Sequence, residues 1–82
     1  MRNYEFYYLI CDAPDKNLFT RQCNALEQHI PDLEKDPILE DVDGSLLQIY
    51  HHEFGQIRVS NSHFYGELSV ESDFDLLQYF KK

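Results

Sequence analysis

With 82 residues, the chain has room for one hydrophobic core, so a single small domain must carry its function. Its 15 acidic residues outnumber its 7 basic ones, and the formal net charge of −8 argues against a protein that holds nucleic acid through phosphate contacts. Apolar residues make up 43% of the chain and include 6 tyrosines and 6 phenylalanines, so the charge does not indicate a disordered acidic tail.

No stretch of the sequence is long and apolar enough to span a membrane, and the first residues lack the basic and apolar segments of a secretory leader. These features predict a soluble, cytoplasmic protein without a membrane partner. Cys11 and Cys23 do not form a CxxC motif, so we expect both thiols to be reduced and to lie in or near the core.

The first predicted elements are a strand and a helix. Residues 3–11 are rich in aromatic and aliphatic side chains and carry one charge, which predicts a well-buried strand. Asp15 is a suitable N-cap for the helix that follows, and Pro31 ends it. The helix places four apolar side chains on one stripe, namely Phe19, Cys23, Leu26 and Ile30.

Three turn signals then predict an antiparallel meander. The Asp43-Gly44 dipeptide separates two apolar runs and favours a two-residue hairpin of type I′. Further turns are predicted at residues 53–56 and 61–63. We expect strands at residues 37–42, 45–50, 57–59 and 64–71.

The last segment predicts a short C-terminal helix. Ser72 is a suitable N-cap, two acids follow it, and Lys81 and Lys82 end the chain in agreement with the helix dipole. The predicted fold is therefore of the α+β class, with an antiparallel sheet of about four or five strands and with one long and one short helix packed on one face.

The negative charge is concentrated in two segments. Residues 31–45 have a net charge of −5 and residues 67–75 a net charge of −4, while the rest of the chain is close to neutral. Acids at turns and helix N-termini keep a small domain soluble, which is the simplest explanation of this pattern. The functional alternative is a negative surface that attracts a basic partner. The acids concerned are Asp32, Glu34, Asp36, Glu40, Asp41 and Asp43 in the first segment and Glu67, Glu71, Asp73 and Asp75 in the second.

Alternation along the strands predicts which side chains face outward. With Ile57 and Val59 facing the core, Arg58 lies on the outer face, where it can neutralise Glu67 on the next strand. A face that combines tyrosines with charges suits protein recognition, although an ordinary solvated face has the same composition. With Leu47, Ile49, Phe64, Leu68 and Val70 inward, the predicted outward set is Gln48, Tyr50, His52, Tyr65, Glu67, Ser69 and Glu71.

The search for catalytic and metal sites returns no specific motif. A calcium loop built around Asp41 and Asp43 would need carboxylates at Leu39 and Tyr50, so the sequence does not predict an EF-hand. Neighbouring histidines in a strand point to opposite faces and cannot bind one metal. Because the sequence has neither a nucleophile elbow nor a glycine-rich phosphate loop, we expect no enzyme activity and no cofactor.

These patterns favour a small acidic protein that binds another protein and covers a basic surface on it, as an inhibitor or an immunity-type protein does. The carboxylates would pair with lysines and arginines of the partner, and Tyr50 and Tyr65 would be the aromatic anchors, with His52 beside them. The alternative is a non-catalytic structural or regulatory subunit, for which a homodimer is one option and whose acidity serves solubility. A further option is that the outer face pairs with itself in a homodimer.

Overall fold

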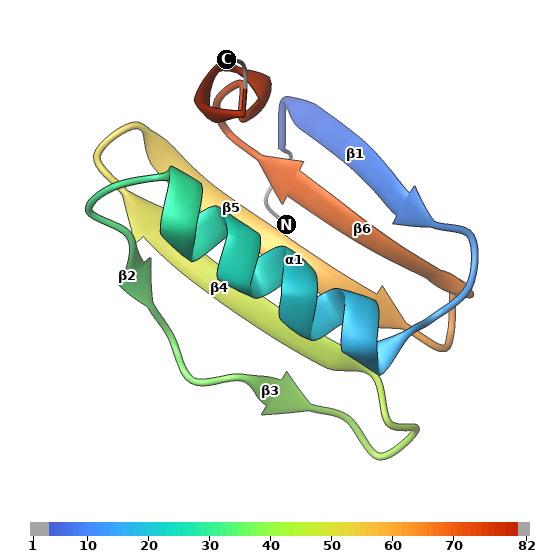
Figure 1. Cartoon of the computed structure of the whole chain (residues 1–82). Helices are drawn as coiled ribbons and strands as arrows, with labels where there is room; N and C mark the ends of the chain where they lie inside the picture. The colour runs from blue at the N-terminus through green and yellow to red at the C-terminus, as the bar shows by residue number, and fades with distance from the viewer. Residues whose placement is uncertain (1–3, 81–82) are drawn as a thin grey trace.

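The computed structural model describes residues 4–80, in which a single sheet is covered by one helix on one of its faces (Figure 1). This architecture confirms the α+β class, with six strands because two short strands of two residues each add to the sheet. In chain order the elements are β1 (Phe6–Cys11), α1 (Lys16–His29), β2 (Glu34–Lys35), β3 (Leu39–Glu40), β4 (Leu46–His52), β5 (Gly55–Ser62), β6 (Glu67–Ser72) and a 3-10 turn, η1 (Leu77–Tyr79).

The strand order across the sheet is β1-β6-β5-β4-β2, and β3 also pairs with β4. All pairings are antiparallel, and β4, β5 and β6 form the predicted meander. The first strand lies beside the last and forms one edge of the sheet (Figure 1). The prediction of a well-buried first strand is therefore wrong, because an edge strand has a neighbour on one side only and here leaves Tyr7 and Leu9 55% exposed. Within residues 4–80, no helix is long and apolar enough to cross a bilayer.

Helix α1 forms as predicted. The Asp15 carboxylate accepts the free N–H groups of Asn17 and Leu18 at 3.0 and 3.1 Å, which stabilises the first turn. The helix ends with Ile30 at its C-cap, directly before Pro31, which cannot donate a helical hydrogen bond.

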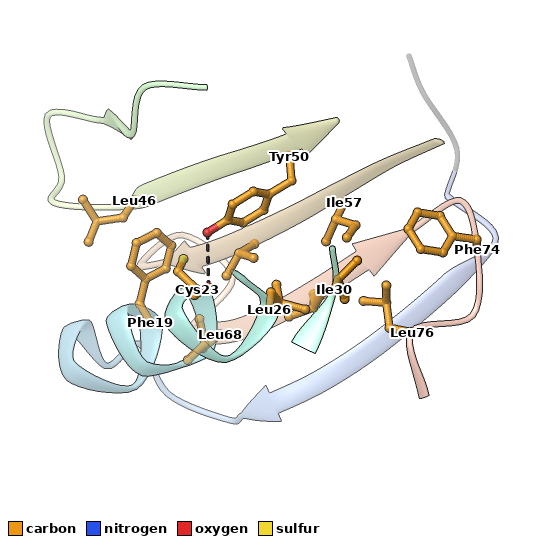
Figure 2. Packing of buried hydrophobic residues seen from close by; sticks show 12 residues of the cluster. Phe19, Cys23, Leu26, Ile30, Leu46, Tyr50, Ile57, Leu68, Phe74 and Leu76 are labelled. Atoms are coloured by element: carbon orange, nitrogen blue, oxygen red, sulfur yellow. Dashed lines mark hydrogen bonds between the residues drawn. The ribbon is translucent and has the colours of Figure 1, made fainter. Parts of the chain in front are cut away.

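The core lies between α1 and the inner face of the sheet (Figure 2). All four residues of the predicted helix stripe are buried, which confirms the helical periodicity. They pack against the sheet side chains Tyr50, Ile57, Val59, Leu68 and Val70, and Phe74 and Leu76 extend the cluster beyond the end of β6.

The hairpin between β3 and β4 has a longer loop than predicted. The Asp41 N–H donates to the Ser45 carbonyl at 2.9 Å, and the Gly44 N–H donates to the Asp41 carbonyl at 3.0 Å. Gly44 has a φ of 87°, whereas Asp43 is not among the described residues with positive φ. A type I′ turn needs positive φ at both central residues, and here only Gly44 has it. The loop is therefore a type I turn that is followed by a glycine in the left-handed conformation.

Strand β5 continues through the residues predicted to be a turn. Asn61 is buried, and its side-chain oxygen accepts the Asp15 N–H at 2.8 Å, so a polar side chain has a partner inside the fold and the strand does not stop there. The turn lies instead at residues 63–66, with Gly66 at a φ of 67°. Phe64, predicted to face the core, belongs to this turn and is 79% exposed.

The C-terminal segment forms only the 3-10 turn η1. The Ser72 hydroxyl accepts the Phe74 N–H at 3.1 Å, as expected of a cap, but Ser72 itself still belongs to β6. Asp73 prolongs the strand pairing, since its N–H donates to the Gln56 carbonyl at 3.1 Å and its carboxylate accepts the Gln56 N–H at 2.8 Å. The chain therefore stays extended past the predicted start of the helix. Lys81 and Lys82, which are predicted to end that helix, lie outside the described residues.

Candidate protein-binding face

Helix α1 covers one face of the sheet, and we call the opposite side the open face. The strand register assigns side chains to it, because residues directly opposite each other on neighbouring strands share a face. Four large apolar side chains lie there, although no other helix or strand of residues 4–80 covers this face. The strand residues of the open face are Tyr7, Leu9, Glu34, Leu39, Leu47, Ile49, His51, Gln56, Arg58, Ser60, Ser62, Glu67, Ser69 and Glu71.

The charges of the open face are arranged across three strands. Arg58 on β5 stands opposite Glu71 on β6, and Arg58 Nη1 lies 3.9 Å from Glu71 Oε1. Tyr7 on β1 stands opposite Glu71 from the other side, and its hydroxyl donates to the Glu67 carboxylate. Glu67 and Glu71 therefore face outward as predicted, but Arg58 neutralises Glu71 and not Glu67, because Ser62 is the residue opposite Glu67.

Tyr50 does not belong to the open face, and its prediction as a surface anchor is wrong. Its side chain is 0% exposed and points toward α1 (Figure 2). The hydroxyl donates to Glu27 Oε2 at 2.6 Å and lies 3.4 Å from the carbonyl oxygen of Cys23. Burial and the neighbouring Glu27 carboxylate raise the pKa of Tyr50 far above its ordinary value, so the hydroxyl stays protonated.

The inward and outward side chains of β4 are exchanged relative to the prediction. Leu46, Gln48 and Tyr50 face α1, while Leu47 and Ile49 face the open side. Both alternating sets contain bulky apolar residues, so the hydrophobic pattern alone does not choose between them. The usable signal is the loop length: with a two-residue loop, Tyr50 pairs with Ile57, which faces inward without ambiguity.

His52 shares the inner face with Tyr50 and is likewise not part of an outward set. Its ring packs against Phe54, Phe74 and Tyr79 at centroid distances of 5.1, 5.1 and 6.3 Å. This aromatic cluster fastens the C-terminal segment to the sheet. The neighbouring His51 faces the open side instead, and its Nε2 lies 2.9 Å from Asp36 Oδ2.

A shallow hollow of about 370 Å³ lies on the open face between the β3–β4 loop and the β5–β6 turn, and we call it the turn hollow. Its lining combines three acidic residues with Arg58, serines and apolar residues. Two aromatic residues of the β5–β6 turn, Phe64 and Tyr65, project beside it with 79% and 77% exposure. The residues that line the hollow are Leu39, Glu40, Asp41, Asp43, Ser45, Leu46, Leu47, Arg58, Ser60, Ser62, Phe64 and Tyr65.

Local hydrogen bonds hold the two turns of this hollow together. The Ser45 hydroxyl accepts the His63 N–H at 2.9 Å, and Asp43 Oδ1 accepts the Ser45 N–H at 2.9 Å. The bond from Ser45, together with the nearby His63 ring, lowers the pKa of the Asp43 carboxyl. The Phe64 and Tyr65 rings stand edge to face with centroids 4.9 Å apart, so the aromatic pair is partly preorganised.

The predicted acidic residues therefore do not form one continuous patch. Glu40, Asp41 and Asp43 line the turn hollow together with Tyr65, where Glu40 reaches it from the sheet edge because it pairs with the inward-facing Leu46. Glu67 and Glu71 lie on the open face itself. Asp32 and Glu34 lie at the opposite end of the sheet, around a second hollow shared with Glu53 and both strand histidines, and Asp36 lies beside His51. Asp73 and Asp75 hold backbone in place, since they accept the N–H groups of Gln56 and Leu77.

Sequence reasoning missed several residues of this face. The sequence pattern predicts Tyr7 and Leu9 in a buried strand and Phe64 in the core. Their exposure follows from the edge position of β1 and from the later start of the β5–β6 turn. The Gly66 that closes this turn is the sequence signal that would have located it.

Among the described residues, no three His, Cys, Asp or Glu side chains stand close enough to hold a metal ion. Comparison with family models, curated proteins and solved structures gave no match. The function of the open face must therefore be argued from its own geometry and charge.

Proposed function

We propose that this protein binds a basic surface of another protein with its open face and covers it, in the manner of an inhibitor or an immunity-type protein. The observation that carries the proposal is the turn hollow: an exposed aromatic pair and three acidic residues, Glu40, Asp41 and Asp43, line the same depression. A sheet face that served solubility alone would not need to expose Leu9, Leu39, Phe64 and Tyr65 by 55, 59, 79 and 77%.

The two kinds of residue have different tasks in this binding mode. Phe64 and Tyr65 supply rigid apolar area that loses little conformational entropy when it is buried by a partner. Glu40, Asp41 and Asp43 attract lysines and arginines over a distance and raise the rate of association. Because Arg58 is already engaged by Glu71, the charge that the hollow offers to a partner is negative.

The site contains no arrangement that argues for catalysis. The pair that most resembles part of a catalytic site is His51–Asp36, in which the carboxylate orients the imidazole. The other ring nitrogen of His51 lies 3.4 Å from the amide nitrogen of Gln56, so no described nucleophile stands beside it. We therefore propose a binding function without chemistry.

The test starts with immobilised protein and a lysate, from which a bound protein is identified by mass spectrometry, purified and titrated by calorimetry. The proposal expects a basic partner whose binding weakens as salt rises. Tyr65→Ala should weaken binding by about 2 kcal/mol or more, because it truncates an anchor. Glu40→Lys should slow association, whereas Glu53→Lys, an equal charge change at the far end of the sheet, should leave it nearly unchanged.

Two results would contradict this function. The first is a partner that binds wild type and Tyr65→Ala with the same affinity. The second is a partner for which Glu40→Lys and Glu53→Lys have equal effects, since that result reports net charge and not a site. Reversal of Glu67 and Glu71 to lysine then shows whether the interface extends from the turn hollow across β6.

A further inference from the structure

The strand β1 offers an unpaired edge. Among residues 4–80, no strand pairs with its outer side, so its outward backbone groups are open to another strand. From Phe6 to Cys11 the strand has neither a charge nor a proline, which are the usual devices that keep sheet edges apart. It also exposes Tyr7 and Leu9 on the open face by 55% each.

We infer that two copies of this chain pair through β1, antiparallel and around a two-fold axis, so that the two sheets become continuous. Residues directly opposite each other in an antiparallel pair point to the same face of the sheet. In two identical strands this holds only if the two-fold axis passes between the two copies of one residue, and not beside the bond between two residues. Axes at Tyr8 and at Leu9 are equally close to the middle of the strand, and the register shift after Leu9 favours the axis at Tyr8. This axis places Tyr7 of each copy opposite Leu9 of the other. The dimer therefore contains two such pairs, in which every exposed side chain contacts an apolar one.

The other side of β1 adds apolar surface to the same junction. A groove of about 210 Å³ lies there between β1, α1 and the C-terminal segment, and Ile10, Leu77 and Phe80 are among its lining residues. Ile10 interrupts the pairing with β6, where the register shifts between Leu9 and Cys11. This bulge limits regular pairing to the stretch before it. The two-fold axis sets the grooves of the two copies side by side on the helix-covered face.

The uncharged strand is complementary to a second copy of itself, and charge at the other edge explains why the assembly stops at two. Within each copy Glu67, Glu71 and Asp75 lie beside Tyr7 and Tyr8, but β1 itself contains no carboxylate, so the self-pairing sets no acidic side chains of the strand opposite each other. The opposite sheet edge consists of two-residue strands interrupted by Pro37, with Glu34 and Glu40 in them. An edge of this kind resists pairing, so each chain has one usable edge and a closed dimer forms in place of a fibre.

The first test is sedimentation equilibrium of the wild-type chain between about 5 and 500 µM, a range in which a weak dimer changes its population. We expect a monomer–dimer equilibrium that tightens as salt rises, because salt screens the repulsion between two chains of net charge −8. Binding of a basic partner should have the opposite salt dependence, so the two proposals are distinguishable. A chain that is monomeric over the whole range would overturn the inference.

Matched variants locate the contact. Leu9→Lys should weaken the dimer by about tenfold or more, because it places a charge on the paired edge. Leu39→Lys puts the same charge on an equally exposed residue of the same face, at the opposite edge, and should leave the dimer intact. The reverse pattern would assign the contact to the other edge and refute pairing through β1.

Hydrogen exchange of the wild-type protein provides a readout that needs no variant. Amides of β1 should become more protected as protein concentration rises, whereas those of β2 and β3 should not change. Protection that depends on concentration in β2 and β3 but not in β1 would contradict the inference, whatever the variants do.

Discussion

Tyr50 lies in the core because both its ring and its hydroxyl have partners there. The ring is completely buried, and the hydroxyl donates to Glu27, which also forms an ion pair with Lys35 at 3.4 Å. A buried hydroxyl without a partner would destabilise the fold, and the helix carboxylate removes this penalty. Glu27 of α1 thus stabilises the inward orientation of Tyr50 that the β4–β5 pairing sets.

Removal of this hydroxyl tests the corrected position. Tyr50→Phe should lower the free energy of unfolding by about 1–2 kcal/mol, because it breaks a buried hydrogen bond to a carboxylate. Tyr65→Phe removes the same atom from a side chain that is 77% exposed, and it should change stability by less than about 0.5 kcal/mol. Urea denaturation of the two variants measures both values. Equal effects would mean that Tyr50 is not buried.

The same hydroxyl makes the fold sensitive to alkali. Unfolded tyrosine loses its proton near its ordinary pKa of 10.0, whereas burial and Glu27 keep Tyr50 protonated in the native state. Above pH 10.0 the unfolded state therefore binds fewer protons than the native state, and stability falls as the pH rises further. Tyr50→Phe should reduce this slope without abolishing it, because burial also raises the pKa of Tyr8.

At the scale of elements, turns determine the register of this sheet. The β4–β5 loop sets Tyr50 opposite Ile57, and Gly55 makes the tight turn possible. Its φ is 138°, and an added Cβ would lie 2.5 Å from Asp73 Cβ, so the glycine allows the close approach of the segment that follows β6.

Gly55→Ala should therefore be much more disruptive than an alanine at another left-handed glycine. Gly66 has a φ of 67°, but an added Cβ there would meet nothing within 4 Å. We expect Gly66→Ala to cost about 1–2 kcal/mol through backbone strain alone. Gly55→Ala should cost at least about 1 kcal/mol more, because Asp73 must also move. Thermal unfolding of the two variants measures the difference, and equal costs would argue against close packing at Gly55.

At the scale of the molecule, charge and shape are distributed unequally. One face of the sheet has a helix and a complete core, while the open face carries aromatic residues and carboxylates that no other helix or strand of the described residues covers. The two uses that we propose for this surface are a basic partner on the open face and a second copy at β1. They share the exposed Leu9 but are centred on different residues, and they respond to salt in opposite directions.

The net charge of −8 also affects stability itself. Raising salt from about 0.01 to 0.15 M shortens the Debye length from about 30 to about 8 Å and weakens repulsion among the carboxylates. The melting temperature at neutral pH should rise by a few degrees, since about 1 kcal/mol corresponds to roughly 4–8 °C in a domain of this size. Near the isoelectric point of about 4.7 the same salt step should have a smaller effect. Calorimetry at both pH values checks this, and equal shifts would exclude charge repulsion as the cause.

Local patterns in the sequence determine much of this protein. The cap at Asp15, the stripe of helix α1 and the alternation of β5 depend on neighbours in the chain, so they can be read without a structure. The α+β class follows from the order of these elements. Likewise, Glu67 and Glu71 face outward because Leu68 and Val70 between them are plainly apolar.

Only the tertiary structure decides features that depend on distant partners. The Tyr50 hydroxyl is satisfied in the core because Glu27 of the helix accepts its hydrogen bond, and β1 is exposed because it lies at the edge of the sheet. The two acidic segments stay apart because β5 lies between β4 and β6, so only part of each reaches the open face. Contacts between residues far apart in the chain choose among patterns that are locally equivalent, which is why the binding face needed the fold to be defined.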